Sequence, residues 1–268
     1  MTSPSRTGCL LYTSTPASED RGTQRSLGMW RLAVAALVVS AIGMTFADSG
    51  ADGAGMSLSS RRPATIMELA GMAMEAAGSF HSVLTTRIPG LPPIVLSTDS
   101  ATDYGTQSQS FPGGADTIRV IGRSVFLYAN RIAYQQNFAV KSPKFADEWV
   151  SIPSSNKSYV SIAIDILTPS VVQQIVRATR LKDLGEVQVD GRSAVVIQGS
   201  VSPSPAELAG TLTLYVSATA PHLPLKEVQR DTVQGGVVTN TTVFSKWGER
   251  FKVSEPARFV HAARNAQV

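Results

Sequence analysis

The residues TIRVIGRSVFLY (117–128) decide the fold, because they predict a β-hairpin. Gly122-Arg123 forms a two-residue connection between two strands that alternate in polarity, and a loop of that length fixes the strand register. The register places one aliphatic set on a single face of the hairpin: Ile118, Val120, Val125 and Leu127. The opposite face takes Thr117, Arg119, Phe126 and Tyr128. We therefore expect a sheet with one covered side, and expect Val125→Asp to be more damaging than Phe126→Asp.

Further strands are expected on both sides of this hairpin. Those nearest to it are residues 79–88, 94–102 and 148–153. Asp190-Gly191 marks a second hairpin between 186–189 and 193–198. The remaining strands are expected at 211–217, 224–231, 237–247 and 251–254.

Helical spacing appears in two places, residues 64–78 and 169–181, the second with Pro169 near its start. In the first helix, Met67, Met72 and Met74 form either plain core or an adaptable wall for a ligand. Residues 131–147 predict a loop with helical pieces, and 159–166 is ambiguous. This order of elements predicts an α+β fold with a large antiparallel sheet.

An uncharged apolar run, Leu32–Ala47, follows Arg31 and ends in Thr45-Phe46-Ala47, a small-residue pattern that suits signal peptidase. We expect residues 29–47 to be a signal peptide. The alternative is an uncleaved anchor that contacts the membrane, although the run is shorter than the roughly 20 residues of a comfortable span. Residues 1–28 are either a disordered leader or lie before a true start at Met29. Residues 48–62 predict a flexible linker, and 63–268 a single domain outside the cytoplasm, secreted or held at the envelope.

Composition excludes several functional classes. Charged residues make up only 16% of the chain, the net charge is +4, and no basic stripe is present, so we expect no nucleic-acid partner. The single cysteine, Cys9, precedes the apolar run, which leaves no disulfide or thiolate metal site in the exported part. The histidines lack ligand spacing, and no nucleophile elbow or phosphate-binding loop occurs. We therefore expect no catalytic residue, metal or cofactor.

Residues 64–256 resemble a family of exported actinobacterial-type lipoproteins with a LolA/LppX-like fold. The matching pieces are AAGSF (76–80), EWVSIP (148–153), VQVDG (187–191) with AVVI (194–197), GTLTLY (210–215), PLK (224–226) and FSKWG (244–248). The resemblance implies a curved half-barrel sheet with helices across its open side, where relatives hold acyl chains. Asp48 stands where those lipoproteins carry a lipidated cysteine, so we expect no acyl anchor.

Two functions follow as expectations. The first is a non-enzymatic, monomeric carrier of a lipid or another hydrophobic small molecule in the cell envelope. Its apolar cavity would be lined by Val83, Ile118, Val120, Val125 and Leu127, together with Val187, Val196, Leu212 and Leu214. The alternative is an envelope interaction or stress-sensor module, in which the Thr-rich residues 238–243 form a sheet edge that pairs with a partner protein.

Overall fold

The predicted hairpin forms with the expected register. Strands β4 (Gly114–Ile121) and β5 (Ser124–Ala129) pair Ile118 with Leu127 and Val120 with Val125. Gly122 has a φ of 56°, a left-handed conformation that glycine adopts without strain. The computed structural model describes residues 57–138, 144–156, 158–201, 210–233 and 236–262.

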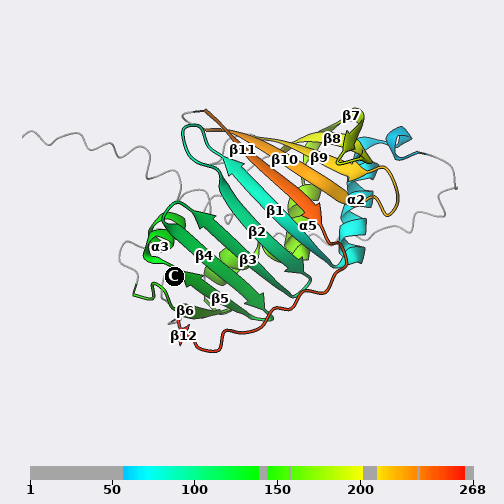
Figure 1. Cartoon of the computed structure of the whole chain (residues 1–268). Coiled ribbons are helices and arrows are strands. Elements are labelled where there is room, and N and C mark those ends of the chain that lie inside the picture. Colours follow the sequence, from blue (N-terminus) through cyan, green and yellow to red (C-terminus); the bar gives the residue numbers. More distant parts are fainter. Residues whose placement is uncertain (1–56, 139–143, 157, 202–209, 234–235, 263–268) are drawn as a thin grey trace, which may run out of the picture.

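Within the described residues, twelve strands form one open sheet, and Figure 1 shows it as a twisted layer with the helices behind it. The strand order is β12-β6-β5-β4-β3-β2-β1-β11-β10-β9-β8-β7. Neighbours are antiparallel except β12, which runs parallel to β6. The other strands are β1 (Ser79–Arg87), β2 (Ile94–Ala101), β3 (Tyr104–Phe111), β6 (Trp149–Pro153), β7 (Thr179–Val189), β8 (Arg192–Val201), β9 (Gly210–Ser217), β10 (Pro224–Val233), β11 (Gly236–Ser245) and β12 (Val260–His261).

The sheet consists of two runs of consecutive strands, β1 to β6 and β7 to β11, with β12 added beside β6. The pairing of β1 with β11 joins them, with Leu84 opposite Thr242 and Thr86 opposite Asn240. The predicted α+β architecture with a large antiparallel sheet is thereby confirmed.

Helices cover one face of the sheet, which we call the inward face. They are η1 (Leu58–Ser60), α2 (Pro63–Ala77), α3 (Arg131–Asn137), α4 (Ser158–Ala163) and α5 (Thr168–Val176). α2 has Pro63 in its first turn and ends at Gly78, whose φ of 70° is the usual left-handed helix stop. Asn130 caps α3 by accepting a hydrogen bond from the Ala133 backbone N–H at 2.9 Å.

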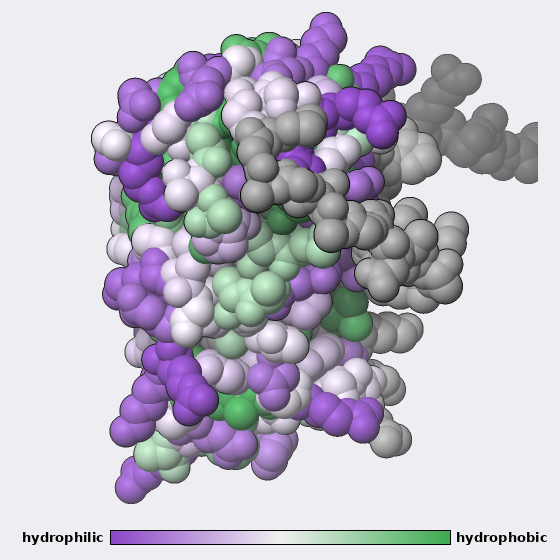
Figure 2. Space-filling model, turned by 90° about the vertical axis from the view of Figure 1, so that its right-hand side faces the viewer, coloured by the Kyte–Doolittle hydropathy of each residue, from purple (hydrophilic) through white to green (hydrophobic). Residues whose placement is uncertain are grey.

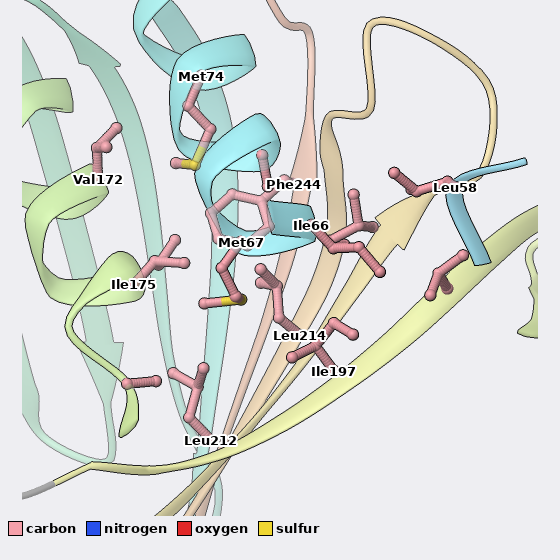
Figure 3. Close-up of a cluster of buried hydrophobic side chains, with 14 of the residues drawn as sticks. Leu58, Ile66, Met67, Met74, Val172, Ile175, Ile197, Leu212, Leu214 and Phe244 are labelled. Atoms are coloured by element: carbon pink, nitrogen blue, oxygen red, sulfur yellow. The ribbon is translucent and has the colours of Figure 1, made fainter. Parts of the chain in front are cut away.

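The first hydrophobic cluster lies between α2, α5 and the β8–β9 half of the sheet (Figure 3). Met67 and Met74 of α2 point into it, above Ile197 and Leu214, so these two methionines belong to the core. Met72 instead lies on the outer side of α2 and is 57% exposed. Figure 2 shows the face that lies on the right in Figure 1, with a patch of mildly hydrophobic residues near its middle.

The second hydrophobic cluster lies where α3 and α4 cover β4, β5 and β6. Val120, Val125, Leu127, Val150 and Ile152 are completely buried in it. Each half of the sheet thus has its own core and its own helices.

Several predicted boundaries differ from the structure. The predicted linker is partly structured, because η1 places Leu58 in the first cluster. The helix expected over 169–181 ends at Val176, since Ala178, just before β7, and Leu181, within β7, reach that cluster instead. Residues 251–254 form no strand. Strand β3 was not predicted, because polar residues fill both of its faces.

The predicted sheet edge at residues 238–243 is wrong. β11 pairs with β1 on one side and with β10 on the other, so its backbone donors and acceptors are already used. β7 and the two-residue β12 are the outermost strands of the described sheet.

The expectation that Phe126 lies on an uncovered face is also wrong. The chain after β11 runs along the lower margin of the sheet to β12 (Figure 1) and covers part of its outward face. Phe259 packs edge-on against Phe126, with ring centroids 5.0 Å apart, and Ser254 accepts a hydrogen bond from Arg119 at 2.9 Å. Phe126 is consequently buried.

Candidate ligand-binding floor

The strand register assigns every predicted site residue to a face, because directly opposed residues in an antiparallel sheet share a side. Six of the nine lie on the inward face. Ile118, Val120, Val125 and Leu127 belong to the second cluster, and Leu212 and Leu214 to the first. All six are buried beneath the helices, so they form core in this structure and present no open surface.

The other three predicted residues lie on the outward face. One register row runs through Val196, Tyr215, Lys226, Val243 and Val83, and both ends of this row were predicted to face a cavity. Val187 lies opposite Ala194, on the same side as Val196, and is 40% exposed. Alternation of polar and apolar residues shows which residues of a strand share a face. It does not show which of the two faces of a distant strand points toward the helices.

A different part of the inward face remains accessible between the two clusters. It consists of two adjacent register rows that cross β2, β1, β11 and β10. The first row is Leu96, Leu84, Thr242 and Glu227, and the second is Ile94, Thr86, Asn240 and Gln229. All eight side chains are partly exposed although they lie on the helix-covered side. We call these eight residues the central floor.

Buried residues surround the central floor on most of its perimeter. Thr98, Ser82 and Phe244 bound it along one end of the strands, and Val238 and Asp231 bound it along the other. Gln109 lies beyond Leu96 on β3, while Leu214 and Leu212 lie beyond Glu227 and Gln229 on β9. The central floor is therefore a bounded, partly exposed patch on the helix-covered side of the sheet, and it is the candidate ligand-binding surface.

The central floor is divided by polarity. On β2 and β1 it presents Ile94, Leu96 and Leu84, whereas on β11 and β10 every position is polar. Thr86 Oγ1 donates a hydrogen bond to Asn240 Oδ1 at 2.7 Å, across the line between the two halves. Gln229 Nε2 donates to both carboxylate oxygens of Asp231 at 3.0 Å. A molecule with an apolar body and a polar end therefore matches this surface.

Glu227 is the ionisable residue of the central floor. It lies between Leu214 on β9 and Thr242 on β11, and burial raises its pKa from 4.5 to about 7. Burial also raises the pKa of the nearby Asp231, while the hydrogen bond from Gln229 opposes that effect. No hydrogen bond or ion pair reaches the Glu227 carboxyl from the described residues.

A separate pocket of about 420 Å³ lies at the end of β8 and β9. The β7–β8 turn and the segment before β10 line it, including Arg192, Ser193, Ser217, Thr219 and Pro221. Ser193 and Ser217 already donate hydrogen bonds, to Glu186 and to the Thr219 carbonyl. None of the predicted site residues lies there.

Two further features were searched for in the part of the chain that the structure describes. No cluster of three or more His, Cys, Asp or Glu residues with metal-binding geometry occurs there. No helix among those residues is both long and apolar enough to cross a membrane. The predicted signal segment, 29–47, lies outside the described residues.

The fold is similar to that of LppX. LppX is a lipoprotein from Mycobacterium tuberculosis, and its sequence is 17% identical to this chain. Its crystal structure matches 71% of this chain and 97% of LppX, with a TM-score of 0.48. LprF from Mycobacterium bovis is 15% identical, with a TM-score of 0.47 over 73% of this chain and 97% of LprF. The MucA/MucB complex of Pseudomonas aeruginosa is 18% identical, with a TM-score of 0.36 over 67% of this chain and 55% of the matched chain.

No protein-family model matches the sequence. No curated protein matches it either.

None of the eight residues of the central floor was predicted to contact a ligand, and Asn240 and Thr242 were assigned instead to the expected sheet edge at 238–243. The strands of the central floor are rich in Thr and Ser, which does not mark them as a ligand-binding surface. The floor exists because β1 pairs with β11, and the two strands are far apart in the chain. One signal was available in the sequence. Glu227 is an acidic residue within a predicted strand whose alternate positions face the core, and an acid in such a place is a candidate functional group.

Proposed function

We propose that this protein is a non-enzymatic binder or carrier of lipid-like amphiphiles in the cell envelope. The observation that carries the proposal is the central floor, a partly exposed surface on the otherwise covered side of the sheet. Its apolar half suits an alkyl chain, since burying apolar area contributes about 25 cal/mol per Å². Its polar half suits a head group.

The first test uses two residues that are adjacent on β1 and point to opposite faces. Leu84 belongs to the central floor, whereas Val83 lies on the outward face. Leu84→Gln is expected to weaken uptake of a fluorescent alkyl probe about tenfold or more, because the removed contact is worth about 1.5–3 kcal/mol. Val83→Gln makes the same change in polarity on the other face and is expected to leave uptake unchanged.

Equal losses in both variants would contradict the assignment of the site to the central floor. Complete failure of the wild-type protein to take up alkyl probes, together with no co-purified lipid in native mass spectrometry, would contradict the function itself.

Export is the second part of the proposal and rests on residues 29–47. Intact-mass measurement of protein from the native host is expected to show a mature chain that begins near Asp48. Recovery of a membrane-bound chain that still contains Leu32–Ala47 would instead support an anchor. Peptides from residues 1–28 would show that Met29 is not the start.

A further inference from the structure

On most strands of the sheet, the charged side chains at the described inward positions are all acidic. Among the described residues, the inward positions of β1 to β5 and β8 to β11 carry the carboxyls of Asp116, Glu227 and Asp231 and no Lys, Arg or His. The basic residues of these central strands point outward. Arg119 stacks over Trp149, and Lys226 lies over the Tyr215 ring, 5.4 Å from its centroid.

Two of the three acids already have partners. Asn137 donates a hydrogen bond to Asp116 at 2.5 Å, and Gln229 holds Asp231. Glu227 has no partner of this kind among the described residues; its neighbours across the strands on the inward face are Leu214 and Thr242, and Leu84 lies one strand beyond Thr242. An ionised carboxylate in such surroundings is costly unless a positive group or a hydrogen-bond donor approaches it.

We propose that the polar half of the central floor selects amphiphiles with a cationic, hydrogen-bond-donating head group such as a primary ammonium, and that Glu227 contacts this head group. This inference rests on the proposed function. A carboxylate or phosphate head group would meet Glu227 and Asp231, and the described inward positions of β1 to β5 and β8 to β11 offer no Lys, Arg or His to compensate, so like-charge repulsion disfavours it. An ammonium would supply the missing donors and the missing charge.

The surroundings of Glu227 determine how this selectivity changes with pH. β9 contributes Leu212 and Leu214, β11 contributes Thr242 and Asn240, and β1 contributes Leu84, none of which titrates. Asp231 is the other titratable group on the inward face of β10, and burial raises its pKa as well, while Lys226 and Arg230 of the same strand lie on the outward face. Both carboxyls become more negative as pH rises, so affinity for a cation is expected to increase from pH 6 to pH 8.

The experiment compares three ligands with one alkyl chain length, decylamine, decanol and decanoate, as competitors of a neutral fluorescent alkyl probe on the full chain. Wild-type protein at pH 8 is expected to bind decylamine about tenfold more tightly than decanoate, which corresponds to about 1.4 kcal/mol. Glu227→Gln is expected to reduce this preference to about threefold or less. Glu255→Gln removes the same charge at an exposed position away from the floor and is expected to retain the wild-type preference.

A wild-type preference for decanoate, or an unchanged amine preference in Glu227→Gln, would overturn the inference. Equal binding of all three ligands would overturn it while leaving the proposed function intact. No binding of any ligand would overturn both. The pH dependence gives a test without mutation: decylamine stays protonated from pH 6 to pH 8, so a preference that does not rise over this range also contradicts the role of Glu227.

Discussion

Thr86 on β1 donates a hydrogen bond to the side chain of Asn240 on β11 at 2.7 Å, between residues 154 positions apart in the sequence. This bond lies at the junction of the two strand runs and within the central floor. It fixes the side-chain oxygen of Asn240 at this junction.

Thr86→Val keeps the shape of the side chain and removes the donor. We expect it to destabilise the protein by about 0.5–1.5 kcal/mol, the usual net contribution of one hydrogen bond. Urea denaturation measures the change. Thr85→Val, on the outward face of the same strand, is the control and should have a smaller effect. A neutral Thr86→Val would mean that the bond adds nothing to the β1–β11 junction.

Gly105 on β3 lies beneath the segment between α4 and α5. A Cβ at this position would come within 2.6 Å of the Ile166 side chain and 2.8 Å of the Asp99 carbonyl oxygen. Because the second contact is with backbone, Gly105→Ala is expected to cost about 1–3 kcal/mol through overpacking. Ser108→Ala, at an exposed outward position on the same strand, should change the melting temperature little. Similar melting temperatures for both variants would show that Ile166 is not held against β3.

Tyr134 lies in the second cluster and Tyr159 packs against it, and the two hydroxyls differ in whether they have a hydrogen-bond partner. The Tyr134 hydroxyl is buried with no hydrogen-bond partner among the described residues, and burial raises its pKa to about 12. The Tyr159 hydroxyl donates to the Gly122 carbonyl at 2.9 Å. Tyr134→Phe is therefore expected to be neutral or stabilising, and Tyr159→Phe to cost about 0.5–1.5 kcal/mol. The opposite order in thermal melts would contradict this assignment of partners.

The pKa of Glu227 predicts how stability depends on pH. The unfolded chain releases this proton near pH 4.5, whereas the folded protein keeps it until about pH 7. The folded state thus binds more protons between these values, so stability falls as pH rises from about 4.5 to 7 and stays lower above 7.

Glu227→Gln is expected to remove this part of the pH dependence and to stabilise the protein at pH 8 by no more than about 3 kcal/mol. Urea denaturation at pH 5 and pH 8 tests it. Asp231, whose pKa is also raised, leaves a smaller slope of the same sign. A variant that loses stability at pH 8 would show that the carboxylate has a favourable partner.

Phe259 anchors the chain after β11 to the outward face through its ring contact with Phe126. Phe259→Ala is expected to destabilise the protein by about 1–2 kcal/mol, less than a fully buried Phe would, because Phe259 is only partly buried. It should also increase protease cleavage of residues 246–262. Phe251→Ala, in the same segment, is the control. Equal cleavage of the two variants would show that Phe259 is not the anchor.

The sequence was sufficient for the local features of the fold. The Gly122 and Asp190-Gly191 hairpins follow from turn chemistry, and the alternation around Val125 gave the correct register and face. β3 escaped prediction because Gln107 and Gln109 are buried through hydrogen bonds, with Thr98 and Asn137, and not through hydrophobicity. The pairing of β1 with β11 has no local signal at all. The central floor depends on that pairing, so the candidate site could not be found from the sequence.

The β1–β11 junction also has a consequence for how the protein folds. Every other antiparallel pair joins strands consecutive in the chain, but this one must close a loop of more than 150 residues. Closing so long a loop reduces the conformational entropy of the chain before the β1–β11 contacts have formed to compensate. Such steps are typically slow in proteins of high contact order. The central floor spans this junction, with β2 and β1 on one side and β11 and β10 on the other. A ligand bound across the floor would contact both runs of strands. Its binding energy would therefore stabilise the β1–β11 pairing, which joins the two antiparallel strands that lie farthest apart in the chain.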